Sequence, residues 1–439
     1  MIRQLPHPFP RPCLQLAAFI GIVIAATVRV RADDEFFERA PISYTNSVAK
    51  DPGSALASAM AAGTTTIKAA DSRAVLRQVL ALLKVPEWSQ VLVFSKTSKQ
   101  TDLISPATPR AVYFSDDVYV GWVPGGLIEI AAADPDRGMI FHTIDPREAI
   151  VAPPARDNTC LSCHATARTE RVPGVFVRSI YPDANGRPLL RHGGFDVTDH
   201  SPLTERWGGW YVTGHHGNAR HLGNAIANDN NGQLVIDTNP GANLDNLSGK
   251  FDTTRYLRPD SNIAALLVLE HQCRTHNLIH KCTLDLLRMR WLETQIHPDE
   301  NPDRADGPYA AMAARCAGEL AAAFLFTNEA DLGDGVEAAG DFTAKFPATG
   351  PRARDGRSLR DLRLYRRLFK HRCSYMIHSP SFQHSPPMLR QLTLAKLHDA
   401  LSAKDQSGLA AHIPAAERDR ILAILADTIP AWPAPSPAR

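Results

Sequence analysis

The run Ala111-Val112-Tyr113-Phe114-Ser115-Asp116-Asp117-Val118-Tyr119-Val120-Gly121-Trp122-Val123-Pro124-Gly125-Gly126-Leu127-Ile128-Glu129-Ile130 holds three short apolar segments separated by turn residues. Valine, isoleucine and aromatic side chains favour strands, and Ser-Asp-Asp and Pro-Gly-Gly suit tight turns. The run therefore predicts a β-sheet whose strands follow one another closely. Strand-like segments at 90–94, 138–141, 175–181 and 210–213 extend this character along the chain.

Helical periodicity dominates after about residue 260. Apolar residues recur at helical spacing in five segments: 263–292, 310–326, 357–369, 387–402 and 415–427. One earlier segment, 72–83, has the same period. The sequence therefore predicts an α+β fold, with a β-rich part at 33–258, a mainly helical part at 259–428 and a Pro-rich tail at 429–439.

The first 32 residues have the order of an export signal. Arg3 and Arg11 precede an almost wholly apolar stretch, and Val30-Arg31-Ala32 supplies small residues before an acidic start. The apolar core is short for spanning a bilayer, although an uncleaved anchor is an alternative. We expect a periplasmic or otherwise exported protein with no stable membrane span after cleavage, in a compartment where disulfides persist.

Composition excludes several classes of protein. The 439 residues are 44% apolar and 21% charged, which is typical of a globular chain rather than a disordered one. The 48 basic residues are balanced by 46 acidic ones. We therefore expect no nucleic-acid partner, because such binders carry a clear basic excess.

Cys160-Leu161-Ser162-Cys163-His164 is the motif with the clearest chemistry. C-x-x-C-H is the attachment sequence of c-type haem, in which two thiols form thioethers to one porphyrin and the adjacent histidine binds the iron. The motif predicts one covalent haem c, with Cys160 and Cys163 as thioethers and His164 as the proximal axial ligand and iron-binding residue. A zinc site and a redox-active dithiol are the alternatives.

The second axial ligand is predicted from histidines further along the chain. The segment 199–224 combines two tryptophans, several glycines and four histidines, and aromatic rings pack well on a porphyrin face. The distal candidates, in order of preference, are His216, His221, His271 and His200. A tight β-hairpin with tryptophan in its core and histidine at its surface is the alternative interpretation.

Several of these segments together resemble one family. The segments are Val93 to Ser98, Ile104 to Ala111, Tyr113 to Trp122, Cys160 to His164, Trp207 to Gly214, Leu269-Glu270-His271-Gln272, His276-Asn277 and Cys373 to Ile377. They are similar to exported bacterial proteins described as cytochrome c domain-containing, over roughly 41 to 428. The resemblance implies haem attachment at Cys160 and Cys163 with His164 as ligand. It implies no reaction, substrate or partner. His200, His216 and His221 match its pattern better than His215 and Cys273.

Three weaker features have plain structural alternatives. His276 and His280 share a helix face and could bind a metal or the haem, or simply pack. Cys273, Cys282, Cys316 and Cys373 could form two disulfides, for example Cys316 with Cys373, or remain as buried thiols. Eight arginines between 352 and 372 could dock an acidic redox partner or haem propionates, or cover a solvated helix face.

The sequence favours an exported monohaem c-type cytochrome-like protein that transfers single electrons with an unidentified redox partner. One alternative is a haem enzyme acting on a small oxidant such as peroxide, with Glu205 or Arg206 as the distal acid or base. The other is a haem-based sensing or binding module.

Overall fold

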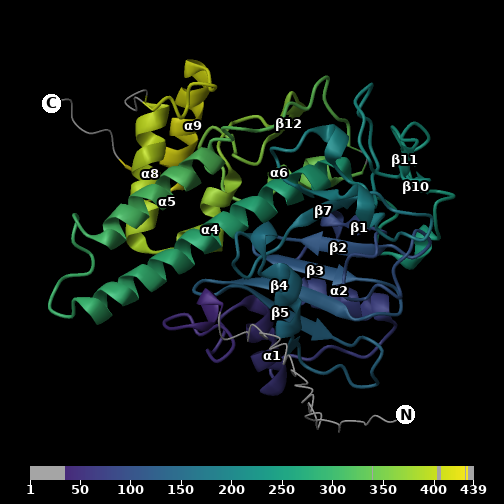
Figure 1. Ribbon diagram of the computed structural model, residues 1–439, viewed down its shortest axis with the longest axis horizontal. Coiled ribbons are helices and arrows are strands. Elements are labelled where there is room, and N and C mark those ends of the chain that lie inside the picture. Colours follow the sequence, from purple (N-terminus) through teal and green to yellow (C-terminus); the bar gives the residue numbers. More distant parts are fainter. Residues whose placement is uncertain (1–34, 339, 403–406, 431, 434–439) are drawn as a thin grey trace, which may run out of the picture.

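The computed structural model describes residues 35–338, 340–402, 407–430 and 432–433. The predicted export signal and most of the predicted tail lie outside these residues. Within them the chain forms one large sheet, several short hairpins and a group of helices (Figure 1).

The large sheet is antiparallel throughout and has the strand order β6-β5-β4-β3-β2-β1-β9. Its strands are β1 (Val91–Val93), β2 (Arg110–Phe114), β3 (Val118–Trp122), β4 (Ile128–Asp134), β5 (Gly138–Ile144), β6 (Ala155–Arg156) and β9 (Trp210–Tyr211). The tight turns predicted at Ser115–Asp117 and Pro124–Gly126 join β2 to β3 and β3 to β4. Gly125 has φ +87°, a conformation that favours glycine.

Side chains alternate between the two faces of this sheet, and each face is covered differently. On one face, Ile128, Ile130 and Ala132 of β4 pack in a cluster with α2 (Ser72–Leu82). Asp71 begins that helix by accepting hydrogen bonds from the backbone N–H groups of its first turn. On the other face, Ala133 belongs to the main core, which includes the buried helix α4 (Ile263–Ile296).

Helix α4 connects the sheet to the helical group. In Figure 1 it runs diagonally from the sheet to the cluster of α5, α8 and α9, and it contacts both β5 and α5. The remaining helices are α1 (Pro52–Ala61), α3 (Leu161–His164), α5 (Pro308–Phe324), α6 (Phe342–Ala348), α7 (Pro380–Gln383), α8 (Pro387–Leu401) and α9 (Ala415–Thr428). The predicted α+β fold is confirmed, with the sheet in the N-terminal half and most helices in the C-terminal half.

Three two-stranded sheets complete the fold, and one of them corrects a prediction. They are β7 (Val177–Ile180) with β8 (Gly194–Val197), β10 (Ala227–Asn230) with β11 (Gln233–Ile236), and β12 (Leu362–Tyr365) with β13 (Arg367–Phe369). The helix predicted at 357–369 is wrong, because this segment folds as the β12–β13 hairpin. Leu364 and Arg366 have φ +57° and +63°, which a right-handed helix does not allow.

The arginines of this segment do not form a solvated helix face, and most are bound within the molecule. Arg366 pairs with Asp331, Arg367 and Arg372 both pair with Glu417, and Arg360 pairs with Asp116. Because acidic partners neutralise them, they do not make a continuous basic surface.

The four cysteines beyond the C-x-x-C-H motif are free, buried thiols. The Cys282 thiol lies 4.0 Å from the backbone oxygen of Cys316, across the contact of α4 with α5. The structure therefore has the free-thiol alternative and no Cys316–Cys373 bridge. Among the described residues, no helix is both long enough and apolar enough to cross a membrane.

Candidate functional site

The Cys160–His164 motif forms two consecutive helical turns at the edge of the large sheet. A 3₁₀ turn (Asn158–Cys160) leads directly into α3. Asp157 begins the first turn by accepting the Thr159 N–H, and Lys99 Nζ lies 2.6 Å from the Asp157 carboxylate. Asp157 itself is held by a backbone hydrogen bond to Phe141 of β5. The motif is thus anchored to the sheet immediately before its first cysteine.

His164 has a defined tautomer. Its Nδ1 lies 2.9 Å from the carbonyl oxygen of Gly174, which can only accept, so Nδ1 carries the proton. Nε2 then holds the lone pair, and no hydrogen bond joins it to another described residue. The ring lies between Phe141 and Phe176, with centroid distances of 5.0 and 5.1 Å. Burial lowers the pKa of His164 and so favours the neutral imidazole, the form that binds a metal.

Helix α4 holds the segment that orients His164. Asn277 accepts the Val175 N–H at 3.0 Å and donates to the Val175 carbonyl at 2.7 Å. A Cβ on Gly174 would lie 2.3 Å from Asn277 Oδ1, so only glycine allows this close approach. Gly174 also donates its N–H to the His164 carbonyl. Gly174 and Asn277 therefore position the imidazole without contacting its free nitrogen.

The motif neighbours a half-buried part of the sheet that carries two opposite charges. Arg110 of β2 and Glu129 of β4 form an ion pair at 2.7 Å, and both act electrostatically on Cys160 and His164. The Arg110 guanidinium lies over Gly121, where a Cβ would come within 1.9 Å of it. Val112 and Ala131 face the same side and are partly exposed. Small side chains and the Arg110–Glu129 pair thus lie near Cys160 and His164.

Cys160 lacks the lowered pKa that is typical of a reactive dithiol. Burial and the charge of Asp157 raise the pKa of Cys160 to about 11, so it stays a thiol near neutral pH. Reactive cysteines of redox dithiols have lowered pKa values instead. Cys163 is exposed and Cys160 is half-buried, and both are free. The donor set of two free thiols and one oriented imidazole fits covalent haem c.

The imidazoles of the first two distal candidates, His216 and His221, already form hydrogen bonds with backbone groups. His216 donates from Nδ1 to the Ala219 carbonyl and accepts the Asn243 N–H at Nε2. His221 accepts the Gly223 N–H at Nδ1, which places its proton on Nε2. The two rings pack against each other with centroids 4.4 Å apart. Either could bind iron through Nε2 only after losing one of these backbone bonds.

The third candidate, His271, lies in a fully buried polar network. Its Nδ1 is 2.9 Å from Asp199 and its Nε2 is 2.6 Å from the Ser374 hydroxyl, while Phe326 stacks on the ring. The neighbouring Glu270 accepts from Arg206 and Trp207. Burial raises the pKa of Glu270 to about 7, against the opposing effect of Arg206.

This network joins two segments that the sequence marks as distinctive, 206–207 and 269–272. Because Arg206 is buried and bound to Glu270, it is not free to serve as an acid or base at a haem. Glu205 lies in a 3₁₀ turn (Leu203–Glu205) and is partly exposed.

His200, the last candidate, has the least engaged ring. Its Nε2 is 3.9 Å from Asp199, and no hydrogen bond holds either ring nitrogen among the described residues. Its side chain is one-third exposed. In the β7–β8 hairpin Val177 pairs with Val197, so Phe176 and the residues after Val197 lie at the same end. His200 therefore lies at the end of the hairpin next to the segment that orients His164.

His276 and His280 pack in the interior. His276 bonds through Nδ1 to Tyr119 and through Nε2 to Asp117 and Ser381, and His280 stacks on it. Within the described residues, no group of three or more His, Cys, Asp or Glu side chains is arranged to hold a metal ion.

Sequence reasoning missed Gly174, Arg110 and Gly121 as parts of the site. Asn277 belongs to a segment with a distinctive pattern, His276-Asn277, but its role depends on Val175, which is 102 residues away. A local sequence pattern cannot predict such a long-range contact. Comparisons with protein-family models, curated proteins and solved structures give no significant match to this chain.

Proposed function

We propose that this chain is an exported monohaem c-type cytochrome-like protein. Haem c would be bound covalently through Cys160 and Cys163, with His164 as the proximal ligand. The observation that carries the proposal is the His164 tautomer: Nδ1–H donates a hydrogen bond to the Gly174 carbonyl, which leaves Nε2 as the only ring nitrogen with a free lone pair. A proximal histidine characteristically gives its second nitrogen to such an acceptor, which fixes the ring and raises its basicity.

The function that these residues support best is single-electron transfer. Bound haem supplies a one-electron couple, and its axial ligands and surroundings set the potential. The chain contributes the fixed imidazole, two flanking phenyl rings and the Arg110–Glu129 pair. Arg110 acts electrostatically on Cys160 and His164, and its guanidinium would be available to pair with a haem propionate. Electron transfer is preferred to peroxide chemistry because Arg206, a candidate distal acid or base, is buried and bound to Glu270.

The test is expression of the full chain in a bacterium that attaches c-type haem during export. We expect a coloured protein whose denatured mass exceeds that of the mature chain by one haem. The Cys160→Ala, Cys163→Ala double variant should lack that mass. A Cys273→Ala, Cys373→Ala double variant is the matched control and should keep it. Colourless wild-type protein from cells that mature a control cytochrome would overturn the proposal.

The distal ligand is tested by comparing three variants. We propose His200 as the first residue to examine, because its ring nitrogens are not bound elsewhere among the described residues. If His200 is distal, His200→Ala should convert a low-spin visible spectrum to a high-spin one that responds to carbon monoxide. His216→Ala and His221→Ala should then keep the low-spin spectrum. A change confined to one of the latter two would return the assignment to that residue.

A further inference from the structure

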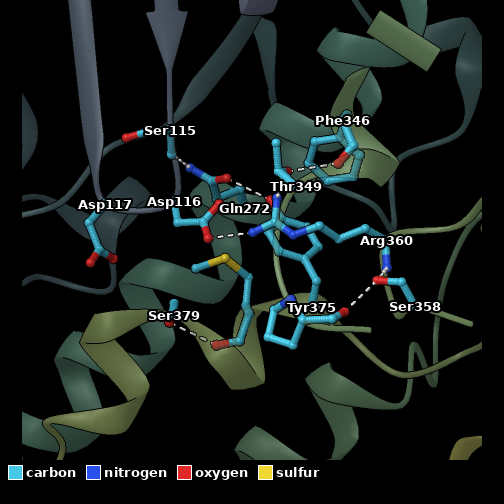
Figure 2. A network of polar contacts seen from close by, with 12 residues as sticks. Ser115, Asp116, Asp117, Gln272, Phe346, Thr349, Ser358, Arg360, Tyr375 and Ser379 are labelled. Carbon is cyan, nitrogen blue, oxygen red and sulfur yellow. Dashed lines mark hydrogen bonds and ion pairs between the residues drawn. The ribbon is translucent and has the colours of Figure 1, made fainter. Parts of the chain in front are cut away.

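A second candidate site lies between the sheet and the helical half, away from the Cys160–His164 motif. It is a cavity of about 310 Å³ bounded by the α2–β1 connection, the end of β2, helix α4 and the segment after α6. Its walls include Lys84, Trp88, Phe114, Gln272, Phe346 and Arg360. Figure 2 shows the Arg360 side chain reaching across this region towards Asp116.

Arg360 is the central polar group of the cavity. It is 5% exposed, and its guanidinium lies over the rings of Phe346 and Tyr375 at 4.9 and 4.4 Å. One terminal nitrogen pairs with Asp116 and the other donates to Thr349 at 3.2 Å. The Nε–H is buried without a hydrogen-bond partner among the described residues. Gly350, another wall residue, packs closely on it, since a Cβ there would come within 2.6 Å of Nε.

The other polar groups of the cavity do not supply an acceptor for the Arg360 Nε–H. Gln272 is fully engaged, since it donates to Ser115 and Tyr119 and accepts from Tyr375. Lys84 is exposed and forms no ion pair with another described residue. Two cations therefore face one carboxylate, Asp116, and the lining carries one uncompensated positive charge. A buried donor without a partner is costly, and a ligand that supplies an acceptor removes that cost.

We propose that this cavity binds a small organic monocarboxylate with a flat, apolar body. The carboxylate would accept from Arg360 Nε and neutralise the excess charge with Lys84. The body would lie against the aromatic side chains of Trp88, Phe114 and Phe346, which offer it a large apolar surface. The volume falls at the lower end of the range of small-molecule sites, so it suits a ligand of one ring.

The same features argue against inorganic phosphate as the ligand. A phosphate near neutral pH carries more charge than the single positive excess of the lining, and Asp116 would repel it. The three aromatic side chains of the lining cannot replace the hydrogen bonds that phosphate makes with water, so its desolvation would be costly. A ligand with one negative charge matches the single positive excess of the lining, and its apolar body matches the aromatic side chains.

The experiment is isothermal titration calorimetry on the full-length, haem-loaded protein, with phenylacetate as the probe. We expect saturable, one-to-one binding of phenylacetate. Phenylacetamide, which has the same shape without the charge, should bind at least about tenfold more weakly. Phosphate should neither bind nor compete. Absence of phenylacetate binding, or equal binding of the amide, would overturn the proposal.

Variants locate the binding. Arg360→Lys keeps the charge but removes the Nε donor, and should weaken phenylacetate binding about tenfold or more. Arg354→Lys is the matched control, because Arg354 belongs to the same arginine-rich segment but its side chain is 91% exposed. Its binding should equal that of the wild type. If Arg360→Lys does not fold, as judged by circular dichroism, the exposed Lys84→Met decides, with an expected loss of about two- to fivefold.

If Arg360→Lys binds phenylacetate with wild-type affinity, the assignment of binding to this cavity is wrong. The same holds for Lys84→Met when it is the deciding variant. The result is independent of the proposed electron transfer, since the haem spectrum is recorded on the same samples. Coloured protein without phenylacetate binding rejects only the cavity, and colourless protein that binds the probe rejects only the haem.

Discussion

At the scale of single residues, the partner of each imidazole nitrogen decides what that histidine can do. His164 is bound through Nδ1 by a carbonyl and so presents a lone pair at Nε2. His221 accepts an N–H at Nδ1 and so carries its proton at Nε2. The two residue types are identical, and one backbone group makes the chemical difference between a ligand and a donor.

Asn277 is predicted to be a stability-determining residue at this scale. Asn277→Ala leaves both the N–H and the carbonyl of buried Val175 without partners, so we expect a loss of about 2 kcal/mol or more in the free energy of unfolding. Urea denaturation followed by circular dichroism measures it. Asn185→Ala, at an exposed turn, is the control and should change stability by less than about 0.5 kcal/mol. Equal effects of the two substitutions would show that the Asn277 bonds do not matter.

His371 is predicted to contribute to acid sensitivity. It is 1% exposed, both ring nitrogens lack partners among the described residues, and burial lowers its pKa to about 4. The unfolded chain binds this proton near pH 6.5, so between about pH 6.5 and 4 it takes up more protons than the folded state and stability falls on acidification.

His371→Phe removes the titration, so its stability should decline less over that interval, by up to about 3 kcal/mol. Denaturation midpoints at pH 7, 5.5 and 4 give the comparison. Parallel slopes for wild type and His371→Phe would disprove the assignment.

At the scale of elements, the arginine-rich segment at 357–369 shows how tertiary contacts override a helical pattern. Its leucines and arginines recur at helical spacing, yet the chain turns back between Leu364 and Arg366 to form β12 and β13. Ion pairs to Asp331, Asp116 and Glu417 hold individual arginines in that conformation. These partners come from three different regions of the chain, so the local pattern contained no sign of them.

The hairpin turn offers a stabilising substitution. Arg366 has φ +63°, which costs a non-glycine residue about 1 kcal/mol, and its ion pair with Asp331 is exposed and therefore weak. Arg366→Gly should raise the melting temperature slightly, corresponding to about 0.5–1 kcal/mol. Arg363→Gly, within β12, should lower it, because glycine weakens a strand. Differential scanning calorimetry distinguishes the two, and a lower melting temperature for both would refute the expectation.

At the scale of the whole molecule, one core joins the sheet to the helices. Its buried members include Val91, Tyr119 and Phe141 from the sheet, and Leu269 and Phe324 from α4 and α5. The cavity lined by Arg360 and the hydrogen bonds between Asn277 and Val175 both depend on that junction, since each combines residues from the two halves of the chain. The halves are therefore parts of one packed unit in the described residues.

We predict that residues 33–258 do not fold without the remainder. Removing α4 exposes the sheet face that carries Tyr119 and Phe141, and leaves Val175 without Asn277. The isolated fragment should lack near-ultraviolet circular dichroism, whereas the full chain should unfold in a single calorimetric transition. A folded fragment, or two separate transitions in the full chain, would contradict this prediction.

Local sequence predicted every strand of the large sheet except β6, and the helices α2, α4, α5, α8 and α9. It is also the basis of the haem c prediction at the C-x-x-C-H motif. These depend on alternation, helical period, turn residues and the spacing of two thiols, all of which act between near neighbours. Only the tertiary structure decided the His164 tautomer, the folding of 357–369 as a hairpin and the unpartnered Nε of Arg360. Gly174 approaches Asn277, and Arg360 approaches Asp116, across 244 residues in the latter case. Such contacts follow from how the core packs, because burial forces polar groups to find partners wherever the fold brings them, and no short window of sequence contains that information.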